Sequence, residues 1–191
     1  ITKTDSMKGS FLGPCYSQNE IEKSLNKIGG KYEIMDDKSL INFTSKELAK
    51  GKVVGWFQER MEFGPRALGA RSIIADPRSD SMQKNLNLKI KYRESFRPFA
   101  PAILSDSASK YFELNADSPY MMVTSNVRME HRHKITTEES QKQGLEKLTI
   151  ARSSISAVTH VDNSARVQTV HKATNPRFHQ LLECFQLFCR L

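Results

Sequence analysis

The spacing of apolar residues along the chain predicts several helices. Ile21, Leu25 and Ile28 recur every three or four positions, which places them on one face of a helix over residues 17–30. A Ser-x-x-Glu pattern at the start of this stretch has the form of a capping box, and a Gly-Gly pair marks its end. Further helices are predicted over residues 44–51, 79–90, 107–114 and 176–191.

Short runs rich in β-branched and aromatic residues predict strands between these helices. They cover residues 31–36, 52–58, 71–76, 120–127, 155–162 and 165–170. The last two runs are separated by Asn163-Ser164, a turn pair, and are expected to adjoin. Residues 96–105 hold two prolines in an apolar run, which favours an edge strand or an irregular segment.

Strands alternating with helices, plus a hairpin-like pair, predict a mixed α/β domain of the α+β kind. With 191 residues, the chain is long enough for one core and short for two. Residues 1–16 show little periodicity and are interpreted as a linker, so that the domain covers 17–191. The polar stretch 128–153 predicts a mobile excursion with some helix. Because the helix over 176–191 is apolar to its end, we expect a strand to follow it and the domain to be incomplete at its C-terminus.

The formal net charge is +8, which suits a polyanionic partner such as a nucleotide, a phosphate or a nucleic acid. From charge alone, it is nearly as reasonable that the positive net charge has no specific function. The three cysteines, Cys15, Cys184 and Cys189, form no C-x-x-C pair, which argues against a disulfide framework and a thiolate zinc site. Reduced thiols fit a cytoplasmic protein. No apolar stretch approaches the ~20 residues needed to cross a bilayer.

The stretch "FGPRALGARSIIADPR" at 63–78 carries three arginines around a short apolar run. Gly64-Pro65 predicts the start of a short helix, because proline suits the first helical position. Arg66 would then lie beside unpaired backbone N–H groups, which favour an anion, and its guanidinium matches phosphate or carboxylate oxygens. The alternative is that Arg66 pairs with Glu62 or Asp76.

A second basic stretch, "KIKYRESFRPF" at 89–99, interleaves cations with aromatic residues. This composition fits a triphosphate beside a stacked base, or single-stranded nucleic acid. The alternative is a solvated helix end with surface lysines, in which Arg97 is partnered only by Glu94.

A third stretch, "THVDNSARVQTV" at 159–170, places four polar side chains near a tight turn: His160, Asp162, Arg166 and Gln168. On two adjoining strands they could surround a small polar substrate, although a lone strand histidine is more often structural. Metal-binding H-x-x-x-H patterns, glycine-rich phosphate loops and nucleophile motifs are absent from the sequence. A bound nucleotide would therefore be held by arginines and lysines.

Together these stretches resemble the C-terminal domain of carbamoyltransferases of the NodU/CmcH family. The resemblance rests on "ERMEFGPRALGARSIIADPR", "KYRESFRPFAP" and "HVDNSARVQTV", in that order, and runs from about Gly13 to the end. It implies a YrdC/Sua5-like fold, a twisted mixed sheet flanked by helices. It also implies that the family's chain continues past the last helix into a strand and an N-T-S-F-N segment that contributes to the nucleotide site.

The resemblance implies an activity as well. The domain would bind ATP, with Mg²⁺, and carbamoyl phosphate, and would form carbamoyl-adenylate. The carbamoyl group would then pass to a hydroxyl of a small-molecule acceptor in an upstream Kae1-like domain of the same full-length protein. That upstream domain carries the family's metal site, so no metal is expected in this chain.

The positions that match the family's nucleotide and carbamoyl-phosphate contacts are Arg66, Lys91, Arg97 and Arg166. The resemblance implies that Lys91 and Arg97 are also catalytic, by stabilising charge that develops on phosphoryl oxygens. Three positions depart from the family pattern: Glu59 replaces a glycine, Ala70 replaces an asparagine, and Asn163-Ser164 replaces Gly-Thr.

Two other interpretations stay open from the sequence. One is a basic YrdC-like module that binds RNA without catalysis, and the other is an assembly domain that only packs against a missing partner. The arrangement of the cations separates them. Convergence on a pocket of nucleotide size favours the enzyme, whereas a spread along an open groove favours RNA.

Overall fold

The computed structural model describes residues 5–189 of the chain. The α-helices are α1 Gln18–Lys27, α2 Asp37–Ala49, α3 Met82–Lys89, α4 Ala108–Tyr111, α5 Thr137–Gln141 and α6 Pro176–Cys189. The strands are β1 Val54–Phe57, β2 Arg71–Ile74, β3 Ala102–Leu104, β4 Thr124–Asn126, β5 Ser164–Arg166 and β6 Gln168–Val170. The predicted mixed α/β fold of the α+β kind is therefore confirmed.

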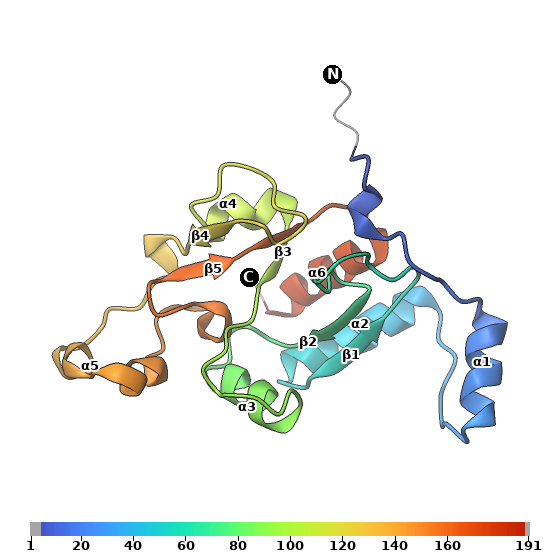
Figure 1. Cartoon of the computed structure of the whole chain (residues 1–191), viewed down its shortest axis with the longest axis horizontal. Coiled ribbons are helices and arrows are strands. Elements are labelled where there is room, and N and C mark those ends of the chain that lie inside the picture. The colour runs from blue at the N-terminus through green and yellow to red at the C-terminus, as the bar shows by residue number, and fades with distance from the viewer. Residues whose placement is uncertain (1–4, 190–191) are drawn as a thin grey trace.

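The six strands form three separate pairs (Figure 1). β1 and β2 are antiparallel, β4 and β5 are antiparallel, and β3 runs parallel to β6. β5 leads through Val167 into β6, so one continuous stretch of chain links the second and third pairs. In Figure 1, α1 and α5 project at opposite ends of the molecule, away from these strands.

Two hydrophobic clusters are joined by this stretch of chain. The first is built by α2, β1, β6 and α6, and its buried residues are Ile41, Trp56, Val170, Phe178 and Leu181. The second lies around α4 and β5 and includes the fully buried residues Phe112, Val127 and Val167. Because Val167 belongs to one cluster and Val170 to the other, the stretch of chain that runs from β5 into β6 packs against both clusters.

Several predicted elements are confirmed. α1 has the predicted capping box, in which the Ser17 side chain accepts from the Glu20 backbone and the Glu20 carboxylate accepts in return. β1, β2, α3, α4 and α6 form where the sequence places them. Trp56 is a core residue, as expected, and its indole donates to Gln58 Oε1 over 2.7 Å.

Outside the Arg66 loop, three predictions of secondary structure are wrong. Residues 31–36 form no strand, because they are largely exposed and no neighbouring strand pairs with them in the part of the chain described. α2 begins at Asp37 rather than near Thr44, because the Asp36 side chain caps it by accepting from the Ser39 N–H. Residues 155–162 contain a short 3-10 helix instead of a strand, although the predicted turn is present, with Asn163 at φ +63°.

The leading segment lies against the body of the domain. The Ser10 hydroxyl donates to Phe63 O over 2.7 Å, and the Gly13 N–H donates to Met61 O over 2.9 Å. Within residues 5–189, none of the helices has the length and apolar character needed to cross a bilayer.

Candidate functional site

A buried carboxylate shapes the loop that carries Arg66. Glu62 is only 5% exposed, and its Oε1 accepts from the backbone N–H groups of Leu68 at 2.7 Å, Ala70 at 2.6 Å and Arg71 at 3.3 Å. One carboxylate thus accepts from three backbone N–H groups that would otherwise need other acceptors. The short helix predicted after Gly64-Pro65 is therefore wrong, and residues 62–70 form a clamped loop instead.

Gly69 fixes the path of this loop against α6. Its φ is +103°, a conformation that favours glycine, and an added Cβ would lie 2.4 Å from a ring carbon of Phe178. This glycine therefore lets the backbone of the loop approach a core aromatic ring closely. From the other side, the Gln168 amide donates to Leu68 O over 2.8 Å, so β6 also holds the loop.

The three arginines of this stretch have different surroundings. Arg78 forms a bidentate pair with buried Asp76. The Arg71 guanidinium donates to the carbonyls of Gln58, Glu59 and Ala70 and stacks 3.4 Å above the Phe57 ring.

Arg66 is the arginine of this stretch whose side chain is available to a ligand. It is exposed, and no acid within residues 5–189 forms an ion pair with it. The alternative that Arg66 pairs with Glu62 or Asp76 is therefore wrong. Glu62 bonds the backbone, and Asp76 is occupied by Arg78.

Arg166 lies near Arg66, although a hundred positions separate them in sequence. Burial lowers the pKa of Arg166 below its ordinary value, and the charge of Arg66 lowers this pKa further. The Arg166 Nε is buried and has no hydrogen-bond acceptor in the described structure. A buried N–H donor without an acceptor is costly, so this atom is suited to an acceptor brought by a ligand.

His160 and Asp162 adjoin Arg166 at the turn before β5. Burial lowers the pKa of the His160 imidazole, Asp162 raises this pKa, and Arg166 lowers it. Asp162 accepts from the Ser164 hydroxyl at 2.7 Å and from the Ser164 N–H, and these hydrogen bonds lower the pKa of its carboxyl group. The carboxylate is thus occupied by its own turn and leaves Arg166 without a bonded acid.

Lys91 and Arg97 lie in a different setting, on the loop between α3 and β3. Arg97 Nε donates to Glu94 over 2.8 Å, and both side chains are about half exposed, at 54% and 52%. Lys91 is exposed. Among the described residues, no hydrogen bond or ion pair joins either side chain to Arg66 or Arg166. The assignment of Lys91 and Arg97 to the same site as the two arginines therefore stays a prediction.

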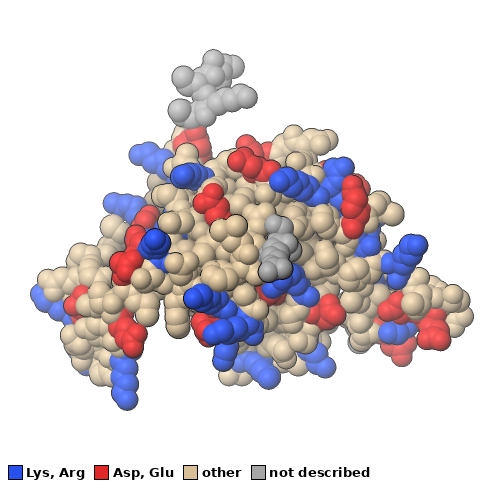
Figure 2. Space-filling view, turned by 180° about the vertical axis from the view of Figure 1, so that it is seen from behind, with Lys and Arg blue, Asp and Glu red and all other residues tan. Residues whose placement is uncertain are grey.

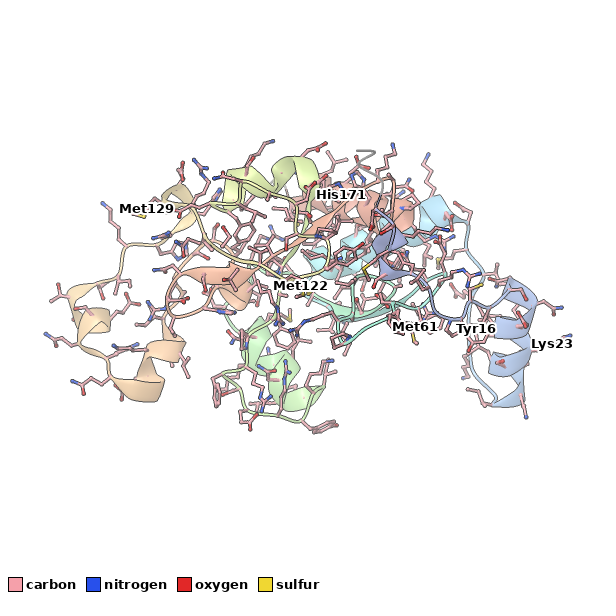
Figure 3. The ribbon with its side chains drawn as sticks, turned by 45° about the horizontal axis from the view of Figure 1, so that its top comes forward. Tyr16, Lys23, Met61, Met122, Met129 and His171 are labelled. Atoms are coloured by element: carbon pink, nitrogen blue, oxygen red, sulfur yellow. The ribbon has the colours of Figure 1, made fainter. Side chains whose placement is uncertain are left out.

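Exposed apolar residues flank the two arginines. Phe63 is 70% exposed and precedes the Arg66 turn, and Met122 is 79% exposed in the segment that leads into β4. β4 places Thr124 opposite Arg166. Figure 3 labels Met122 and also Met61, which is 43% exposed.

One face of the molecule carries charges of both signs. Figure 2 shows Lys and Arg side chains interspersed with Asp and Glu over the back of the molecule, without a continuous basic stripe. Within the part of the chain described, no three His, Cys, Asp or Glu side chains are grouped in a way that could hold a metal ion.

Glu62 is the residue whose role sequence reasoning missed, since it was considered only as a partner for Arg66. A single acid next to a Gly-Pro turn, followed by several residues without a regular pattern, is the signal that could have identified a loop-capping carboxylate.

The chain belongs to a family of carbamoyltransferase domains. Residues 45–189 match the family described as "Carbamoyltransferase C-terminus". The match includes Glu62, both unpaired arginines and the loop that carries Lys91 and Arg97. The resemblance to NodU/CmcH carbamoyltransferases is thereby confirmed.

Individual relatives agree with this assignment. The chain is 54% identical to the uncharacterized protein sll1178 of Synechocystis sp. over 97% of its length, which covers 31% of that relative. It is 36% identical to nodulation protein NolO of Bradyrhizobium diazoefficiens, with 92% of the chain and 29% of the relative covered. It is 39% identical to 3'-hydroxymethylcephem-O-carbamoyltransferase of Streptomyces clavuligerus, with 74% and 23% covered. The chain thus spans about a third or less of these relatives.

Proposed function

We propose that this domain binds ATP and carbamoyl phosphate and forms carbamoyl-adenylate as part of a longer O-carbamoyltransferase. The carbamoyl group then passes to a hydroxyl of a small-molecule acceptor in an upstream Kae1-like domain. The proposal extends the family assignment, and its support comes from the surroundings of Arg66 and Arg166.

The single observation that carries the proposal is that Arg66 lies close enough to Arg166 for its charge to lower the pKa of Arg166, while no acid within residues 5–189 forms an ion pair with either arginine. Two like charges held close together destabilise each other, and the buried Nε of Arg166 also lacks an acceptor. A bound polyanion removes both costs, because its oxygens accept the hydrogen bond and its charge offsets the repulsion. Phosphate groups of ATP or of carbamoyl phosphate supply these features.

The residues around the pair keep it in place before the ligand arrives. The Glu62 carboxylate and the Gln168 amide fix the loop that carries Arg66, and β4 pairs with the strand that carries Arg166. Donors that need no rearrangement stabilise developing charge most effectively. Arg66 and Arg166 therefore position the phosphates and stabilise the charge that grows on them when the phosphoanhydride bond breaks.

Lys91 and Arg97 complete the site in this proposal. Their loop would approach the bound anion, and Lys91 would then stabilise the leaving pyrophosphate. Arg97 would exchange its exposed contact with Glu94 for a contact with the ligand. No protein nucleophile is required. Water cleaves carbamoyl phosphate to carbamate and phosphate, and a carbamate oxygen then attacks the α-phosphorus of ATP, which gives carbamoyl-adenylate and releases pyrophosphate.

Calorimetric titration of the full gene product with an ATP analogue and with carbamoyl phosphate tests the proposal. Arg66→Ala and Arg166→Ala should each weaken binding by about 10- to 100-fold, which corresponds to roughly 1.5–3 kcal/mol for a hydrogen bond to a charged group. Lys23→Ala is the matched control: it removes one positive charge from α1, far from the site, and should leave affinity unchanged (Figure 3).

A short single-stranded RNA in the same titration separates the alternative function. Saturable nucleotide binding that is insensitive to both arginine variants would contradict the proposal. Tight RNA binding that Arg66→Ala and Lys23→Ala weaken equally would favour a basic RNA-binding module instead.

A further inference from the structure

The leading segment, residues 5–14, bonds the backbone immediately after Glu62. The Phe63 N–H donates to Ser10 O over 2.6 Å, and the Ser10 hydroxyl donates to Phe63 O over 2.7 Å. Ser10 is only 2% exposed, so that water does not readily replace a partner that is lost here. Both backbone polar groups of Phe63 are thus bonded to a residue that lies 53 positions earlier in the chain.

The same segment bonds the residue before Glu62. The Met61 N–H donates to Pro14 O over 3.1 Å, and the Gly13 N–H donates to Met61 O over 2.9 Å. A Cβ added at Gly13 would lie 2.8 Å from Met61 O, so the two backbones approach more closely than a side chain would allow. The leading segment therefore fixes the chain on both sides of the carboxylate that holds the Arg66 loop.

The start of the leading segment is held at a different part of the domain. The Tyr120 hydroxyl donates to Asp5 Oδ1 over 2.5 Å, and Asp5 Oδ2 accepts from the Gly9 N–H over 2.7 Å. These hydrogen bonds lower the pKa of the Asp5 carboxyl group. Burial and the contact with Asp5 raise the pKa of Tyr120 to about 12. At neutral pH the phenol is therefore protonated and the carboxylate ionised, which are the states that this contact requires.

Tyr120 belongs to the Arg166 side of the candidate site. It lies in the segment that leads into β4, and β4 places Thr124 opposite Arg166. The leading segment is thus bonded at one end to the chain entering the Arg66 loop and at the other to the chain entering the strand beside Arg166. It spans the two parts of the domain whose relative position brings the arginines together.

We propose that the leading segment positions the anion site, with Ser10 and Tyr120 as its two points of attachment. This inference rests on the proposed function, because the anion concerned is the one bound by Arg66 and Arg166. Residues 5–14 lie outside the stretch that matches the family, 45–189. Neither Ser10 nor Tyr120 needs to contact the ligand, so both are positioning residues.

The effect of Ser10 on the ligand passes through Glu62. Without the Ser10 hydroxyl, Phe63 O loses its donor and the chain beside Glu62 is held less firmly. The Glu62 carboxylate then fixes the following loop less well, and Arg66 samples more orientations. A donor that must be ordered on binding gives a weaker complex than one that is already in place.

Hydrogen exchange on the ligand-free full gene product tests whether the segment holds the loop. In Ser10→Ala the amides of Leu68 and Ala70 should exchange at least about 10-fold faster, because the carboxylate that accepts from them is held less firmly. Ser24→Ala is the matched control: it removes a hydrogen bond from a serine hydroxyl to a backbone carbonyl in α1 and should leave exchange unchanged. Unchanged exchange in Ser10→Ala would overturn the proposal.

A double-mutant cycle separates positioning from general loss of stability. Ser10→Ala alone should weaken binding of an ATP analogue to the full gene product by about 3- to 10-fold. In the Arg66→Ala background the same change should weaken binding by less than about twofold, because its effect passes through Arg66. An affinity unaffected by Ser10→Ala, or equal losses in the two backgrounds, would overturn the proposal.

Tyr120→Phe provides a second variant at the other point of attachment, which is less buried than Ser10. It removes one hydroxyl and should weaken binding of the analogue by about two- to fivefold. Tyr16→Phe is the matched control, because Tyr16 is 53% exposed and lies just beyond the leading segment (Figure 3). An affinity of Tyr120→Phe equal to that of this control would contradict the proposed second attachment and overturn the proposal.

The arginine variants distinguish this inference from the proposed function. If Arg66→Ala and Arg166→Ala weaken binding while Ser10→Ala and Tyr120→Phe do not, the anion site stands and the positioning role is overturned. If neither arginine variant affects binding, the proposed function fails, and the positioning role fails with it whatever the exchange rates are.

Discussion

The two arginine-rich loops of this domain, residues 62–71 and residues 90–99, differ in what holds them. The first is fixed by the buried Glu62 carboxylate, by Gln168 and by the Phe178 ring against Gly69. The second is held by the buried Asn87 amide, which donates to Ser95 O and Arg97 O, while the Arg97 side chain is exposed and pairs with Glu94. A high density of arginine and lysine therefore occurs in two loops of unlike construction: a carboxylate that accepts from backbone N–H groups holds the first, and an amide that donates to backbone carbonyls holds the second.

Removing the Glu62 carboxylate, which holds the first loop, should have the largest effect. Glu62→Ala leaves buried N–H groups of Leu68 and Ala70 without an acceptor. The free energy of unfolding should fall by about 3–5 kcal/mol, since each such hydrogen bond to a charged group is worth about 1.5–3 kcal/mol. Urea denaturation measures this change.

Glu33→Ala is the control for this variant, because Glu33 is exposed in the loop before α2. Its effect should stay within about 0.5 kcal/mol. Equal losses for the two variants would mean that the first loop is not held by its carboxylate, and the contrast between the loops would disappear.

Removing the acid that pairs with Arg97 in the second loop should have a moderate effect on ligand binding. Glu94→Gln removes the exposed partner of Arg97, so that this guanidinium is available to a bound anion. Binding of an ATP analogue should tighten by about two- to fivefold, in keeping with the small strength of exposed ion pairs. Calorimetry of the full gene product measures it, and an affinity unchanged by both Glu94→Gln and Arg97→Ala would exclude Arg97 from the site.

Protonation of His160 should have the smallest effect. Burial, as the main cause, holds the pKa of this imidazole below its ordinary value, so the folded state binds a proton less readily than the unfolded state. The corresponding stability is present above the unfolded pKa, near 6.5, and is lost as the pH falls through the lowered folded value. Urea denaturation between pH 7 and 5 should show a smaller decline for His160→Gln than for the unaltered protein.

The same histidine reports on the anion site. A phosphate bound beside Arg166 offsets the charge that lowers the pKa of His160, so NMR titration with the ATP analogue should shift this pKa upward. A pKa unaffected by saturating analogue would place the bound phosphates away from Arg166.

The sequence predicted the periodic elements better than the loops. α1, β1 and α6 follow from apolar spacing, caps and β-branched residues, which are local signals. The strand predicted at 155–162 does not form. Its apolar residues pack in a 3-10 turn, and no strand of the described residues pairs with them. Strand formation depends on such partners, which short-range patterns do not contain.

The roles of the candidate site residues stay predictions, and the sequence did not contain their arrangement. The types and order of the motifs identified Arg66 and Arg166, yet their proximity depends on long-range packing. The role of Glu62 was not predicted, because this carboxylate and the loop that it binds follow no helix or strand periodicity. Whether Lys91 and Arg97 join the same site stays a prediction, since their loop contacts neither arginine through a hydrogen bond or an ion pair in the residues described.

The parallel pairing of β3 with β6 has a consequence for how the domain forms during synthesis. Ala102 pairs with Gln168, so this contact cannot close until the intervening chain, including β4 and β5, has been made. Contacts between distant residues slow folding, whereas the nearby β1 and β2 can pair early. Arg66 therefore lies on a hairpin that can form before Arg166 is in place, and the anion binding that we propose would emerge only late in folding.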